Sequence, residues 1–155
     1  MQKVSPEYTL LILSISSPVL LGVYRDDQLI ETIKSEQKIS DVLLAMIIKV
    51  MDHYPLSKMI YTRGPGSYMA IKLTYIMLKT IEIVKEIPFQ GCSAFALNKG
   101  KPIKAVGNLY FIKVGERIET QKFEQLIPQE FFLPASLEGL KIDEASIPNY
   151  ILPAV

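Results

Sequence analysis

The chain has 155 residues, of which 49% are hydrophobic, and a formal net charge of +1 at pH 7. This length fits one domain, or one domain with a small appendage, that buries a core without disulfides or metal. A nearly neutral chain has no basic field with which to hold a phosphate backbone, so stand-alone nucleic-acid binding is excluded.

The chain has one cysteine, Cys92, and one histidine, His53. A lone cysteine forms no internal disulfide, which favours a reducing compartment, and no HExxH, CxxC or paired-histidine spacing offers a metal site. We therefore expect no metal and no cofactor. Cys92 is expected to be a small buried hydrophobe, and His53 an exposed residue at the end of a helix.

The first part of the chain is predicted to form an antiparallel meander of three strands. Residues 8–16 alternate and are rich in Leu and Ile, and two further strand patterns cover 19–24 and 29–34. Ser17-Pro18 and Asp26-Asp27 are turn signals between these strands.

The apolar run from Leu10 to Tyr24 needs separate attention, since it could be read as a signal peptide. Serines and a proline interrupt it, and no cleavage site of the A-x-A kind follows. It is also too short and too polar to span a bilayer. We expect a cytoplasmic protein with no membrane contact.

Two helices are predicted next, separated by a strand and a short loop. The first begins near Ser40-Asp41, which offers a capping side chain and a carboxylate, and runs to about His53. A strand at 56–62 leads to the loop Gly64-Pro65-Gly66-Ser67. Its serine is placed to cap a second helix, from Tyr68 to about Glu86.

After residue 98 the chain changes character. A short strand at 88–92 and a short helix at 93–98 close the first part. Strand-like pieces follow at 103–106, 109–114 and 118–126, and prolines break the remainder into short segments. We divide the chain into an N-terminal lobe, residues 1–99, and a reduced, mostly β C-terminal lobe, residues 100–155.

Both predicted helices carry more apolar surface than one sheet can cover. Polar residues occupy one arc of each helical wheel, and the apolar remainder is about twice the stripe of roughly 100° that a surface helix needs. Either the helices and the second lobe cover the surplus, or a partner does. We favour a partner.

The predicted contact residues are Val42, Met46, Val50, Ala70, Leu73, Thr74 and Met77. Gly66, Ala70 and Thr74 are small residues four apart, which would let another helix approach closely. The sequence leaves open which helix face is used.

The Gly64-Pro65-Gly66-Ser67 loop lies between a strand and a helix, where backbone N–H groups can hold an anion. No Gly-Lys-Ser/Thr follows, so it is not a Walker A motif. Taken alone, the loop favours a structural turn with a helix cap over a phosphate site.

In context, the loop resembles the TsaB (YeaZ) family. That family has an apolar strand, a GPGSFTGLR-like sequence opening a helix, and then an IP-x-x-G-x-S-S segment. Here Arg63-Gly64-Pro65-Gly66-Ser67, Ile87-Pro88 and Gly91-Cys92-Ser93 match the pattern, with Tyr68 in place of Phe. The resemblance covers roughly residues 8–98.

The resemblance implies an α/β fold of the actin/sugar-kinase (ASKHA) type: a mixed sheet that starts as a three-strand meander, two main helices, and here a mostly β second lobe. It implies a TsaD-type transferase as partner, with a TsaE-type ATPase, in making N6-threonylcarbamoyladenosine on tRNA. The tRNA would be met only through the complex. Family members contact the transferase, or a second copy, through the two helices of the first lobe.

Some residues depart from the family pattern. Ser14 stands where the first strand has an aspartate, and Met69, Ala70 and Lys72 replace the Thr, Gly and Arg after the loop. Ser14 cannot bind a metal-bridged phosphate as an aspartate would. We therefore predict a non-catalytic scaffold subunit. The alternatives are a self-associating protein, a glycoprotease-like hydrolase using Ser67, and a nucleotide-binding module using residues 64–67.

Overall fold

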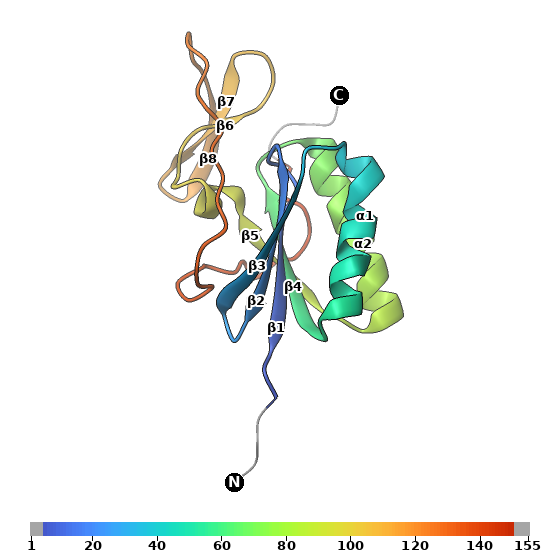
Figure 1. Ribbon diagram of the computed structural model, residues 1–155. Helices are drawn as coiled ribbons and strands as arrows, with labels where there is room; N and C mark the ends of the chain where they lie inside the picture. The colour runs from blue at the N-terminus through green and yellow to red at the C-terminus, as the bar shows by residue number, and fades with distance from the viewer. Residues whose placement is uncertain (1–4, 151–155) are drawn as a thin grey trace.

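The computed structural model describes residues 5–150. A five-stranded mixed sheet carries two helices on one face, and a separate three-stranded antiparallel sheet stands beside it (Figure 1). This arrangement confirms the predicted α/β class.

The large sheet has the strand order β3-β2-β1-β4-β5, so β3 and β5 are its edges. Its strands are β1 (Tyr8–Leu13), β2 (Val19–Arg25), β3 (Gln28–Ser35), β4 (Leu56–Gly64) and β5 (Phe89–Ser93). The first three pair antiparallel, as predicted, and β1–β4 and β4–β5 pair parallel. β1 ends three residues before the predicted boundary, because Ser16 belongs to the turn and its hydroxyl donates to the Pro18 carbonyl, 2.7 Å away.

The β2–β3 hairpin has a two-residue turn at Asp26 and Asp27, whose φ angles are 47° and 68°. Two positive φ values are typical of the type I′ turn, which matches the twist of paired strands. Further along, Tyr24 pairs with Leu29 but Val23 pairs with Glu31, so β3 holds one extra residue at this point.

Helix α1 (Ile39–His53) joins β3 to β4, and α2 (Tyr68–Lys85) joins β4 to β5. Both connect parallel strands on one side of the sheet, so the two helices run in the same direction (Figure 1). The start of α1 differs from the prediction: its N-cap is Lys38, with no side-chain cap. Asp41 instead lies in the first turn, where a carboxylate favours the positive end of the helix.

Each face of the large sheet has its own core. Leu10, Ile12, Leu21 and Val23 face the helices, and their neighbours Leu11, Leu13 and Tyr24 face the other way, as the period of two in a strand requires. The central strand β1 is buried on both faces from Thr9 to Leu13, which explains why it is apolar at nearly every position.

The small sheet comprises β6 (Ile103–Lys104), β7 (Leu109–Val114) and β8 (Arg117–Lys122), after a short 3-10 helix at Ala94–Leu97. The predicted strand at 118–126 is shorter in the structure, because β8 ends with the hairpin at Lys122.

Within residues 5–150, neither α1, α2 nor any strand covers the second face of the large sheet, to which the short 3-10 helix contributes only Leu97. Instead, an extended segment that we call the strap, residues 133–150, runs from one sheet edge to the other. It starts at β3, where Leu29 N–H donates to the Ala135 carbonyl at 2.9 Å. Leu137, Leu140 and Ile142 then pack on the second face. The strap reaches β5 where Asp143 N–H donates to the Gly91 carbonyl at 2.8 Å.

Candidate functional site

The outer surface of the two helices carries large apolar side chains among its polar ones. Six large hydrophobic side chains on α1 and α2 remain between 43% and 71% exposed: Leu44, Ile48, Met69, Ile76, Ile83 and Val84. We call this set the helix face. Met69, Ile76 and Ile83 are seven residues apart and so form one stripe along α2, and Leu44 and Ile48 are one turn apart on α1. The two helices therefore expose apolar surface that the chain's own sheet does not cover, as expected from the sequence.

None of the seven predicted contact residues belongs to this set. Leu73 and Met77 of α2 are half-buried, as are Val42 and Met46 of α1. Met46 lines a hollow on the β3 side of α1, away from α2.

Three of the predicted contact residues point inward: Val50, Ala70 and Thr74 are 2%, 6% and 0% exposed. They lie beneath the outer surface of the two helices, so a partner docked on that surface would not meet them, and the prediction is corrected for them. The row of small residues in α2 serves the chain itself, because a Cβ on Gly66 would meet Ile15 Cγ2 at 3.0 Å. The small side chains let the β1–β2 turn, rather than a partner helix, approach α2.

The Gly64-Pro65-Gly66-Ser67 loop has packing and capping roles. Ser67 Oγ accepts a hydrogen bond from Ala70 N at 3.4 Å and caps α2 as predicted. Gly64 has a φ of 138°, and a Cβ there would run into the backbone carbonyl of Asn149 in the strap. The strap therefore lies directly against the loop.

Ser14, which stands where the family has an aspartate, is 4% exposed and is bonded to Thr74. The two hydroxyl oxygens are 2.6 Å apart, and the Thr74 hydroxyl also lies 2.7 Å from the Ala70 carbonyl. Since the carbonyl can only accept, Thr74 donates to it and Ser14 donates to Thr74. Ser14 thus ties the end of β1 to α2.

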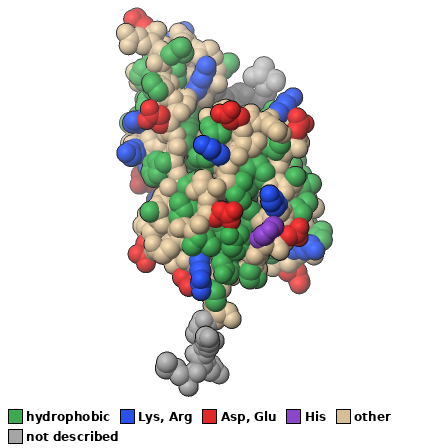
Figure 2. Space-filling view, in the orientation of Figure 1, with side chains coloured by type: hydrophobic (Ala, Val, Ile, Leu, Met, Phe, Trp, Pro, Cys, Tyr) green, Lys and Arg blue, Asp and Glu red, His purple; other side chains and the backbone are tan. Residues whose placement is uncertain are grey.

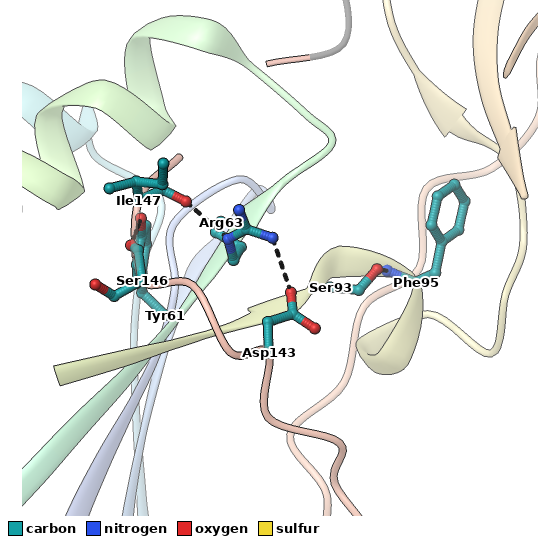
Figure 3. A network of polar contacts seen from close by, with 7 residues as sticks. All are labelled: Tyr61, Arg63, Ser93, Phe95, Asp143, Ser146 and Ile147. Carbon is teal, nitrogen blue, oxygen red and sulfur yellow. Dashed lines mark hydrogen bonds and ion pairs between the residues drawn. The ribbon is translucent and has the colours of Figure 1, made fainter. Parts of the chain in front are cut away.

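Figure 3 shows a polar network that sequence reasoning missed. Arg63, at the end of β4, donates from Nε to the Ile147 carbonyl at 2.7 Å and pairs with the Asp143 carboxylate at 3.1 Å. The Tyr61 hydroxyl donates to the Ser146 carbonyl at 2.6 Å. A polar side chain at the end of a buried strand is a signal in itself, but its partners are about 80 residues away in sequence.

His53 and Cys92 lie where they were expected. His53 is exposed at the C-terminal end of α1, with Nδ1 2.8 Å from the Lys49 carbonyl. Ser67 stands at the N-terminal end of the parallel helix α2, so the histidine is at the opposite end and cannot serve as its base. Burial and, to a lesser degree, the Asp143 carboxylate raise the pKa of the Cys92 thiol to about 12.

Residues 5–150 contain no group of three or more His, Cys, Asp or Glu side chains that could hold a metal ion. Over the same residues, neither helix is long and apolar enough to cross a membrane.

No protein-family model matches the chain, and no curated protein matches it by sequence. Solved structures do match. YeaZ from Pseudomonas aeruginosa superposes with a TM-score of 0.58 at 10% identity, over 80% of this chain and 71% of that one. The chain has a YeaZ-like fold. An uncharacterized protein with similarity to peptidase YEAZ, also from Pseudomonas aeruginosa, matches over the same shares with a TM-score of 0.57 at 10% identity.

The YeaZ-like fold confirms the ASKHA-type architecture that the loop and its flanking segments predict. At 10% identity the likeness concerns the fold alone, and function has to be argued from the chain's own surface.

Proposed function

We propose that this chain is a non-catalytic scaffold subunit that binds and activates a TsaD-type transferase, which makes N6-threonylcarbamoyladenosine on tRNA. A TsaE-type ATPase would join the same complex, and tRNA would be met only through it. The proposal places the protein in the cytoplasm.

The helix face carries this proposal. Six large apolar side chains on two neighbouring helices form an exposed surface of the kind that marks protein–protein contact sites. It lies on the two helices that the TsaB resemblance assigns to partner binding. The Ser14 hydroxyl bonds to Thr74 and Ser67 Oγ caps α2, so each serine has a structural role.

The test is binding of the purified chain to its cognate transferase, measured as complex mass by light scattering and as affinity by calorimetry. Ile76→Glu and Ile83→Glu place a charge in the contact, and we expect each to weaken binding by at least about tenfold. The modification of tRNA in a reconstituted reaction should fall in parallel.

The matched control is Val106→Glu. Val106 is 62% exposed, close to the 71% of Ile83, but it lies beside the small sheet. It should bind the transferase normally. The proposal fails if the wild-type chain does not bind the transferase, or if Val106→Glu weakens binding as much as the two helix variants.

The same face supports a second candidate, a symmetric homodimer formed when the transferase is absent. A two-fold axis would place the α2 stripes of two copies against each other. Light scattering of the isolated chain should then give the mass of a dimer, and Ile76→Glu should return it to a monomer. A wild-type chain that stays monomeric at high concentration excludes this candidate.

A further inference from the structure

The outer edge of β3 has unpaired main-chain groups. The two-residue turn makes Arg25 and Gln28 a hydrogen-bonded pair, and pair types alternate along an antiparallel ladder. The extra residue in β3 shifts the alternation by one, so Gly22–Thr32 and Leu20–Lys34 become the non-hydrogen-bonded pairs. The N–H and C=O groups of Thr32 and Lys34 therefore point away from β2, and on that side β3 has no neighbouring strand among the described residues, 5–150.

This edge already accepts an extended segment at its start. Gln28 forms an antiparallel bridge with Ser136 of the strap, with hydrogen bonds from Leu29 N–H to the Ala135 carbonyl and from Leu137 N–H to the Asp27 carbonyl. The strap then leaves the edge for the second face of the sheet. The stretch from Glu31 to Ser35 pairs with β2 on its inner side, and on its outer side it meets no strand of the part of the chain that the structure describes.

A groove runs beside that free stretch, between β3 and α1. It encloses about 210 Å³, and its apolar lining comes from Ile33, Met46 and Val50. His53 also lines the groove, and Figure 2 shows hydrophobic, basic and acidic side chains beside the purple histidine. A strand added to β3 would point every second side chain toward α1 and so into this groove.

The charges of the groove favour an acidic occupant. The Glu31 carboxylate accepts a hydrogen bond from the Tyr54 hydroxyl at 2.6 Å, so it is engaged within the chain. Lys49, on the same rim, has no carboxylate within 4.0 Å in residues 5–150. A second copy of β3 fits less well, since its one carboxylate, Glu31, is already held by its own Tyr54.

We propose that the β3 edge binds an extended segment of a partner protein by strand addition, with aliphatic side chains in the groove and a carboxylate at Lys49. Main-chain bonds to Thr32 and Lys34 would supply affinity, and the groove would select the sequence. This site is separate from the helix face, so it can be occupied while the helices bind another subunit.

The test starts from a random octapeptide library displayed on phage and selected against the full chain. We expect enrichment of sequences that alternate aliphatic and polar residues and contain Asp or Glu. The affinity of a selected synthetic peptide is then measured by calorimetry for the wild-type chain and for variants.

Thr32→Pro removes one outward N–H and should lower peptide affinity at least about tenfold. An edge strand tolerates proline where the N–H faces solvent, so this variant should fold. Thr32→Ala is its matched control and should bind as the wild type does. Lys49→Ala should weaken binding several-fold, whereas Lys113→Ala, on the small sheet, should not.

A second readout needs no variant. Bound peptide should slow the hydrogen exchange of the Thr32 and Lys34 amides, while Ile33, already bonded to β2, should change little. The proposal is overturned if no sequence is enriched, if selected peptides bind Thr32→Pro as tightly as the wild type, or if these amides gain no protection. A dimer of the chain that Thr32→Pro abolishes would also overturn it, in favour of a second copy as occupant.

Discussion

Thr74→Val should destabilise the fold far more than the same change elsewhere on α2. Valine has nearly the shape of threonine but no hydroxyl, so the Ser14 hydroxyl, 4% exposed, would lose its acceptor. A buried polar group left without a partner costs about 1–3 kcal/mol. We therefore expect the free energy of unfolding to fall by about 2 kcal/mol.

The matched control is Thr80→Val, one and a half turns further along α2. The Thr80 hydroxyl makes the same kind of bond, to the Ile76 carbonyl at 2.8 Å, but it is exposed to water. This variant should change stability by less than about 0.5 kcal/mol. Urea unfolding curves, followed by far-UV circular dichroism, measure both changes.

A double-mutant cycle separates the loss of the Ser14–Thr74 hydrogen bond from the effect of the methyl group that replaces the Thr74 hydroxyl. Ser14→Ala removes the stranded donor, so the Ser14→Ala/Thr74→Val double variant should recover about 1 kcal/mol or more relative to the sum of the two single changes. Additive effects within about 0.3 kcal/mol would refute the assignment of Ser14 as the donor to Thr74.

Three further predictions concern the strap and the buried thiol. Arg63→Ala removes the anchor of Ile147 and Asp143, and hydrogen exchange of residues 143–150 should become faster while that of β1 stays slow; unchanged exchange would mean that Arg63 does not hold the strap. Gly64→Ala drives a methyl group into the Asn149 carbonyl at a φ of 138°, so its thermal midpoint should fall by several degrees, whereas Gly107→Ala, with nothing within 4 Å, should fall less. Cys92 should not react with a disulfide reagent at pH 8 in the native protein, because burial raises its pKa to about 12, but should react fully in urea; rapid native reaction would contradict its burial.

Most strands and both long helices could be predicted closely from the sequence because they have strong local signals, whereas the predicted ends of β1, β6 and β8 lie too far along the chain. β7 has the predicted bounds, 109–114. The turn residues Asp26-Asp27 and the helix-ending Pro88 place the bounds of the neighbouring elements within one or two residues of those in the structure. The start of α1 was less predictable. Ser40 and Asp41 are good capping residues, but the chain enters the helix two residues earlier without a side-chain cap.

The sequence predicts that the two helices expose apolar side chains, but not which side chains these are. A helix that is apolar over most of its circumference has no unique buried arc, so the wheel does not show that Val50, Ala70 and Thr74 face the sheet. The strap could not be predicted at all. It has no periodicity, and the bonds that fix it, such as those of Arg63, join residues far apart in the sequence.

The strap also has a consequence for how the protein is made. A ribosome releases the five strands of the large sheet well before residues 133–150. These residues bond to both edge strands and pack on the second face of the sheet. Until those residues leave the exit tunnel, Leu11, Leu13 and Ile60 remain uncovered on a nascent sheet. The large sheet therefore cannot reach full stability until residues 133–150 have emerged, and nascent chains should need shielding from aggregation during that interval.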